Sequence, residues 1–118
     1  MPALNFKKQF AADVEKGIKR QTIRAHRKDC RNPQPGQTLY LYTGMRTLFC
    51  RKLKEAECLS VEQIYIGLGY DISLGSGEID LAEENAIIAA DGFKTRHEFF
   101  GFFETVHGLP FNGFLIKW

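Results

Sequence analysis

Hydrophobic positions near the start of the chain recur with the spacing of an amphipathic helix. Phe6, Phe10 and Val14 lie four residues apart, with charged residues at many of the positions between them. This period places the three side chains on one face, toward a core. Gly17 follows, at a position where a glycine with left-handed backbone commonly ends a helix. The pattern predicts a helix of about three turns that ends at Gly17.

Runs of β-branched and aromatic residues, separated by turn-forming residues, fill the middle of the chain. Such runs are typical of strands, and the glycines and prolines between them are typical of turns. The predicted strands cover residues 22–24, 37–43, 48–53, 57–66 and 114–118, with a strand or helix cap at 4–6 and a hairpin or edge strand around 70–74.

Two helices are predicted near the end of the chain from their capping signals. Asp80 precedes Glu83 by three residues, and Thr95 precedes Glu98 by the same interval. This spacing lets an acceptor side chain and a glutamate satisfy the free backbone N–H groups of a first helical turn. We expect the first helix to cover 81–90, and the second to carry Phe99, Phe103 and Val106 on one face and end near 107–108.

Several strands and about three helices, without regular βαβ alternation, predict an α+β fold with a mostly antiparallel sheet or barrel. A chain of 118 residues has room for one core, so we expect a single domain over 1–118. Closure into a barrel would remove exposed strand edges.

Composition narrows the class of protein. The hydrophobic fraction is 44% and the charged fraction 25%, as in globular proteins. No apolar stretch is long enough to predict a signal peptide or a membrane-spanning helix. The chain has three cysteines, Cys30, Cys50 and Cys58, an odd number without paired spacing. This pattern argues against a disulfide framework, so we expect the protein to reside in the reducing cytoplasm. They and the three histidines also lack metal-ligand spacing, so we expect neither metal nor cofactor.

Charge is distributed unevenly along the chain. Residues 7–31 hold nine Lys and Arg against three Asp and Glu, whereas residues 71–118 hold three basic against eight acidic groups. The basic segment predicts a positive patch, which suits a phosphate-bearing partner such as RNA, although a solvated basic face is an equally simple explanation.

Residues 17–31 also contain groups that can do chemistry. Side chains alternate along a strand, so Thr22 and Arg24 share a face, and Lys19 joins them only if a turn follows Gly17. A lysine in a partly desolvated cleft can lose its proton and activate a neighbouring hydroxyl. Elsewhere, Tyr42 and Arg46 could stack on a base, while the alternative for the tyrosines is a half-buried place on the outer surface of the barrel.

Residues 17–24 resemble the G-x-K-T-x-T-x-R signature of ASCH domains. The strand at 35–41, the Asp-Gly-Phe element at 91–93 before an aromatic helix, and the hydrophobic strand ending at Trp118 follow in the same order as in that family. The resemblance implies a PUA-like, mostly antiparallel β-barrel with about three flanking helices. It also implies a cleft that faces RNA or a modified nucleoside.

Some ASCH proteins are amidohydrolases that deacetylate N4-acetylcytidine with a lysine, a threonine and a glutamate. By position, the resemblance assigns these roles to Lys19 as base, Thr22 as nucleophile and Asp91 as the acid. Asp91 is one methylene shorter than the family's glutamate, and Arg20 replaces a threonine of the signature. Arg24 matches the basic residue of the signature, and we expect it to contact phosphate or base edges together with its basic neighbours Arg20 and Arg27. Arg46 and Tyr42 are expected to contribute because of their side-chain type. Two alternatives remain open: a non-catalytic RNA-binding module and a ribonuclease.

Overall fold

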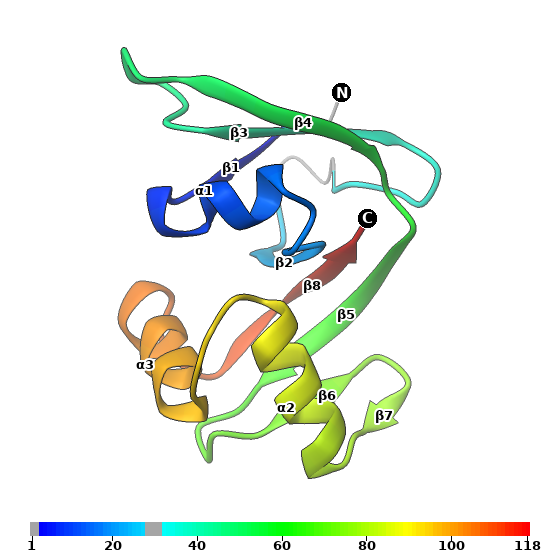
Figure 1. Cartoon of the computed structure of the whole chain (residues 1–118). Coiled ribbons are helices and arrows are strands. Elements are labelled where there is room, and N and C mark those ends of the chain that lie inside the picture. The colour runs from blue at the N-terminus through cyan, green and yellow to red at the C-terminus, as the bar shows by residue number, and fades with distance from the viewer. Residues whose placement is uncertain (1–2, 28–31) are drawn as a thin grey trace.

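A computed structural model describes residues 3–27 and 32–118. The elements in these ranges are β1 (Ala3–Phe6), α1 (Lys8–Glu15), β2 (Gln21–Ala25), β3 (Thr38–Thr43), β4 (Arg51–Glu57), β5 (Ser60–Ile66), β6 (Ile72–Leu74), β7 (Gly77–Glu78), α2 (Leu81–Ala90), α3 (Arg96–Val106) and β8 (Phe111–Lys117) (Figure 1). The predicted α+β class is confirmed.

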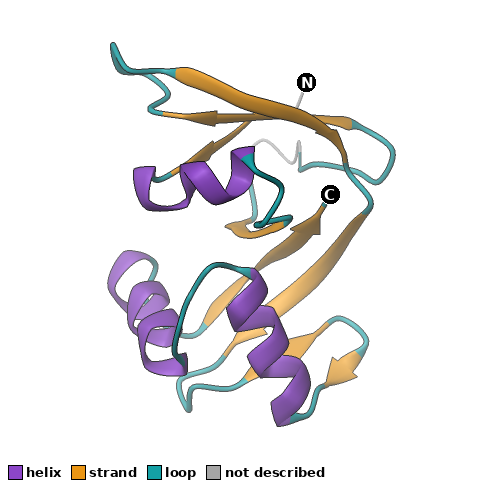
Figure 2. Cartoon of the chain, viewed as in Figure 1, coloured by secondary structure: helices purple, strands orange, loops and turns teal. Residues whose placement is uncertain are grey.

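The strands form two sheets, with the orders β1-β3-β4 and β2-β8-β5-β6-β7. The β1–β3 pair is parallel, and the other pairs are antiparallel. Over the described residues, the hydrogen-bonded ladders do not join these sheets into one closed barrel. Helix α1 lies against the smaller sheet, whereas α2 and α3 lie beside the larger one (Figure 2). Strand β2 lies at one edge of the larger sheet, where it pairs with β8.

The start of the chain follows the predicted pattern with one correction. Phe6 ends β1, and α1 begins only at Lys8, so Phe6 is not part of the helical stripe, although it is buried with Phe10 and Val14. Gly17 has φ of +79°, and the backbone N–H of Lys19 donates to the carbonyl of Asp13 at 3.0 Å. This tight turn brings Lys19 back toward the core.

The predicted strand over 48–53 is wrong in its first half. Leu48 is fully exposed and Phe49 is 84% exposed, because the turn after β3 continues through Cys50. The Thr47 hydroxyl stabilises that turn by donating to the Gly44 carbonyl at 2.6 Å. Strand β4 starts at Arg51, and the break before β5 falls at residues 58–59 rather than before 57.

The capping signals of the two late helices are confirmed. The Asp80 carboxylate accepts a hydrogen bond from the Glu83 backbone N–H at 2.8 Å, and the Thr95 hydroxyl accepts one from Glu98 at 3.1 Å. Helix α2 covers Leu81–Ala90 as predicted. Val106 departs from the buried face of α3, since it is 47% exposed.

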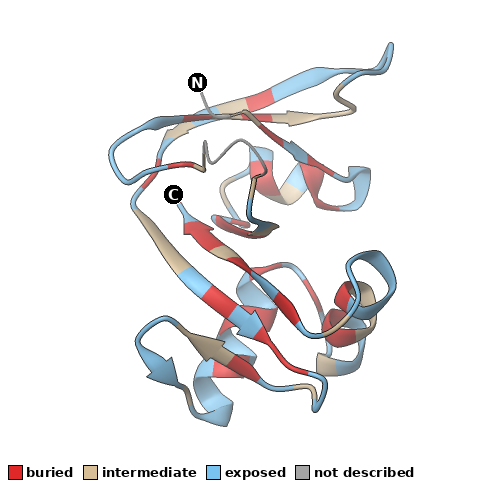
Figure 3. Ribbon diagram, turned by 180° about the vertical axis from the view of Figure 1, so that it is seen from behind, coloured by how far each residue is buried: buried red, intermediate tan, exposed pale blue. Residues whose placement is uncertain are grey.

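The buried apolar side chains belong to one cluster that includes residues of both sheets and all three described helices. Buried residues occur along β5 and β8 and in the lower part of the β3–β4 hairpin, whereas the hairpin tip at residues 46–50 is exposed (Figure 3). Gly113 of β8 allows β2 to lie close, because a Cβ there would be 2.3 Å from the Arg24 carbonyl oxygen. The final strand starts at Phe111, earlier than the predicted residue 114.

Candidate functional site

A cavity of about 270 Å³ lies between β2, the start of α1, the end of α2 and α3. Its polar lining includes Lys7, Lys19, Thr22, Arg24, Asp91 and His107. Its aromatic walls are Phe10, Phe93, Phe102 and Phe103. We call this cavity the Lys19 pocket. Ligand sites of this kind combine apolar walls with a few converging polar groups.

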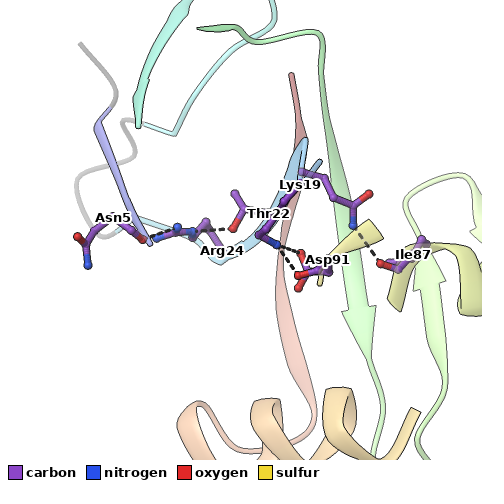
Figure 4. Close-up of polar contacts among 7 residues, drawn as sticks. Asn5, Lys19, Thr22, Arg24, Ile87 and Asp91 are labelled. Carbon is purple, nitrogen blue, oxygen red and sulfur yellow. Dashed lines mark hydrogen bonds and ion pairs between the residues drawn. The ribbon is translucent and has the colours of Figure 1, made fainter. Parts of the chain in front are cut away.

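Lys19 and Asp91 form a buried ion pair in this pocket (Figure 4). Lys19 Nζ lies 3.0 Å from Asp91 Oδ1 and also donates to the Asp91 backbone carbonyl. The two residues are only 3% and 5% exposed. Asp91 therefore reaches Lys19 despite being shorter than a glutamate.

Burial shifts the proton affinities of both groups toward their neutral forms. Loss of water lowers the pKa of Lys19, and the nearby Asp91 carboxylate opposes that change. Burial likewise raises the pKa of Asp91, and the Lys19 ammonium opposes it. The two pKa values therefore lie closer together than those of a free lysine and a free aspartate, which lowers the free-energy cost of moving a proton from Lys19 to Asp91.

Two glycines set the geometry of this pair. The turn at Gly17 directs Lys19 inward, as described above, and Gly92 ends α2 with φ of +99° directly after Asp91. A Cβ at Gly92 would lie 3.0 Å from the Phe10 ring, so a side chain there would force that ring to shift. The Lys19 ammonium lies 4.9 Å from the centroid of the same ring.

Thr22 and Arg24 share one face of β2, as alternation predicted. The Thr22 hydroxyl oxygen, in a residue only 5% exposed, accepts a hydrogen bond from Arg24 Nε at 3.0 Å. The other side of the guanidinium donates to the Asn5 backbone carbonyl at 2.6 Å, which anchors it to β1. Burial lowers the pKa of Arg24 to about 10, so it remains a cation at neutral pH. A cation that donates to a hydroxyl oxygen stabilises negative charge on that oxygen.

The structure separates the other predicted binding residues from this pocket. Arg20 is exposed, and Arg27 lines a neighbouring cavity of about 210 Å³ while donating to the Ala3 carbonyl at 3.0 Å. Tyr42 belongs to β3 and Arg46 to the exposed turn beyond it, and neither lines the Lys19 pocket. Lys19, Thr22, Arg24 and Asp91 are thus brought together, and the remaining four predicted residues are not.

Sequence reasoning missed several residues that line the pocket or support it. Phe93, Phe102 and His107 line the pocket. In the sequence, the two phenylalanines resemble core residues and His107 resembles the end of a helix, and His107 is indeed the C-cap of α3. Gln21 supports the buried pair, because its amide donates to the Ile87 carbonyl at 3.2 Å and its side chain lowers the pKa of Asp91 by hydrogen bonding. Phe93 could have been predicted as a pocket residue from the sequence, because it lies only two residues after the candidate acid Asp91.

Cys50 and Cys58 do not line the Lys19 pocket. In the described ranges, Cys50 is exposed and Cys58 is buried, both as free thiols, whereas Cys30 lies outside the described residues. Residues 3–27 and 32–118 contain no group of three or more His, Cys, Asp or Glu side chains that could hold a metal ion. Within the same ranges, no helix has the length and apolar character needed to cross a membrane.

Comparison with known proteins yields no match: no family model fits the sequence, and neither curated proteins nor solved structures include a significant relative.

Proposed function

We propose that this protein binds RNA or a modified nucleoside in the Lys19 pocket and hydrolyses the amide of an N4-acylated cytosine base. The observation that carries this proposal is the convergence of Lys19, Thr22 and Asp91 on one aromatic-walled cavity. The cavity volume of about 270 Å³ is small for a ligand site, which suits a ligand of no more than one nucleoside or nucleotide unit.

The proposed reaction divides the hydrolysis into two steps. The Thr22 oxygen attacks the acyl carbonyl carbon while its proton passes to neutral Lys19, and the C–N bond breaks as that proton reaches the leaving amine. The free cytosine amine departs, and the acyl group remains on Thr22. Water then attacks the ester, which releases the carboxylic acid and restores the hydroxyl. The overall change is amide plus water to amine plus carboxylic acid.

Each side chain has a physical reason for its role. Burial lowers the pKa of Lys19, which favours the neutral amine that a base requires. Asp91 holds that amine at 3.0 Å and takes part in the proton transfer. The Arg24 hydrogen bond to the Thr22 oxygen at 3.0 Å stabilises negative charge on that oxygen, which favours loss of the hydroxyl proton.

The non-catalytic RNA-binding module has one observation in its favour. The hydrogen bonds of Lys19 Nζ go to Asp91, and among the described residues Thr22 Oγ1 is bonded to Arg24 rather than to Lys19. In this alternative the buried pair is structural, and the pocket only holds a base. In the amidohydrolase, substrate binding brings the amine and the hydroxyl into contact.

The test is incubation with N4-acetylcytidine and a panel of other N4-acylated cytosine compounds. The wild-type protein should release cytidine and the carboxylic acid, and Thr22→Val should abolish turnover while retaining the fold. Thr38→Val is the matched control, because Thr38 is an exposed threonine on β3. Absence of turnover by folded wild-type protein over the whole panel would reject the amidohydrolase. Shortening of labelled RNA would instead support the ribonuclease.

The same proposal extends to the fold. We propose that the sheets β1-β3-β4 and β2-β8-β5-β6-β7 correspond to the two sides of a PUA-like β-barrel, with the Lys19 pocket at its mouth. The shared hydrophobic cluster between the sheets supports this correspondence.

A further inference from the structure

Two cations of the Lys19 pocket lack a carboxylate partner among the described residues. The ion pairs in these ranges are Lys19–Asp91, Arg51–Glu15, Lys52–Glu55 and Arg96–Glu84. Arg24 bonds instead to two neutral oxygens, the Thr22 hydroxyl and the Asn5 carbonyl. The Lys7 ammonium lies over the Phe102 ring, 4.7 Å from its centroid.

His107 lies in the field of these two cations. Its ring stacks on Phe103, with centroids 5.7 Å apart, and it lines the same pocket as Lys7 and Arg24. Burial and both cations lower the pKa of His107. The imidazole is therefore a neutral hydrogen-bonding group at neutral pH, in the same pocket as two cations.

The pocket consequently carries excess positive charge on one side. Asp91 is paired with Lys19 at 3.0 Å, so its carboxylate only partly offsets the charge of Arg24, and among the described residues neither Arg24 nor Lys7 has a direct carboxylate partner. A partly buried guanidinium without an anionic partner is unfavourable, and an anion that accepts its hydrogen bonds relieves that cost. A ligand with a negative group on this side would bind more tightly than its neutral analogue.

We infer that the pocket takes a phosphate-bearing nucleotide rather than a bare nucleoside, with the phosphate bound between Lys7, Arg24 and His107. This inference rests on the proposed function for the base-binding half of the pocket, where Phe10 and Phe93 form the walls. It places the phosphate inside the pocket mouth and not on exposed Arg20 or on Arg27, where the basic patch alone would put it. Both a free nucleotide and a phosphate of an RNA strand have this chemistry.

The test compares the affinities of cytidine, 5′- and 3′-cytidine monophosphate and a short RNA with one internal cytidine. We expect at least one phosphate-bearing ligand to bind about ten-fold more tightly than cytidine at low salt, with a gain that shrinks as salt rises. Tighter binding of a monophosphate assigns the site to a free nucleotide, and tighter binding of the RNA assigns it to a strand. Equal affinity of cytidine and all phosphate-bearing ligands would overturn the inference.

A matched pair of variants locates the phosphate. Lys7→Met should remove most of the affinity gain, whereas Lys8→Met should leave it intact, because exposed Lys8 lines a different cavity with Phe6 and Ala11. Equal losses in the two variants would show that the gain comes from general attraction and would contradict a site at Lys7.

A probe without any base separates this inference from the proposed function. Titration with inorganic phosphate, followed by NMR of the His107 ring, should raise the pKa of His107, since an added anion offsets the influence of Lys7 and Arg24. That result together with no turnover of N4-acylated cytidines would leave the phosphate site standing and reject the amidohydrolase. If N4-acylated cytidines are turned over, but phosphate leaves the pKa of His107 unchanged and phosphate-bearing ligands bind no more tightly than cytidine, the amidohydrolase stands and the phosphate site is rejected.

Discussion

The Lys19 pocket and the β3–β4 hairpin both contain a cation paired with a carboxylate, but in opposite surroundings. In the pocket, Lys19 meets Asp91 at 3.0 Å with side chains 4% and 7% exposed. Beside the hairpin, Arg51 meets Glu15 at 2.7 Å with side chains 52% and 45% exposed. The Arg51–Glu15 pair has the shorter distance but should contribute less to stability, because water screens an exposed ion pair. Burial, not basic charge alone, distinguishes the candidate site.

The largest expected effect comes from breaking the buried pair. Asp91→Leu leaves the Lys19 amine without its partner and should lower the free energy of unfolding by about 3–5 kcal/mol. Urea denaturation measures this change. The double variant Lys19→Met/Asp91→Leu should recover much of the loss, because no charge then remains buried. Equal losses in the single and double variants would show that packing, not charge pairing, is responsible.

A second change tests the glycine that brings the end of α2 against α1. Gly92→Ala should cost about 1–2 kcal/mol for a left-handed backbone, and more because the added methyl group would meet the Phe10 ring at 3.0 Å. Gly36→Ala is the control, with φ of +90° and open space around the position. Thermal unfolding should rank Gly92→Ala as the more damaging, and equal losses would exclude a role for the close approach.

The sequence was informative where the signals are local. The bounds of α2 follow from Asp80, Glu83 and Gly92, which are near neighbours of its ends. Alternation along β2 placed Thr22 and Arg24 on one face, and Gly17 indicated the turn that Lys19 needs.

Long-range contacts were beyond such signals. Asp91 lies 72 positions from Lys19, and only the family resemblance suggested the pair. The aromatic walls come from two different helices and a loop, so a helical period could assign Phe102 to the core but not to a cavity. Arg46 and Tyr42 were predicted from side-chain type alone, and the hairpin directs them elsewhere.

The exposed pair should respond far less than the buried one. Glu15→Gln removes the partner of Arg51 and should change the free energy of unfolding by less than about 1 kcal/mol. Urea denaturation at low and at high salt measures it, and the difference should vanish at high salt. A loss as large as that of Asp91→Leu would contradict the contrast drawn between the two regions.

The smallest effect concerns pH. The folded-state pKa of His107 is lowered, so between that value and 6.5 the unfolded state binds more protons than the folded state. Stability should therefore rise with pH through this window and fall as the solution is acidified across it. His107→Asn should flatten that part of the curve of unfolding free energy against pH, and an unchanged slope would count against the field of Lys7 and Arg24 at this ring.

The central claim is that the ligand binds in the Lys19 pocket and not on the exposed basic surface. Titration of isotope-labelled protein with N4-acetylcytidine, followed by backbone NMR shifts, tests it most directly. We expect the largest shifts at Thr22, Arg24 and Phe93, with Tyr42 and Arg46 unmoved. Shifts confined to Tyr42, Arg46 and Arg20 would contradict it.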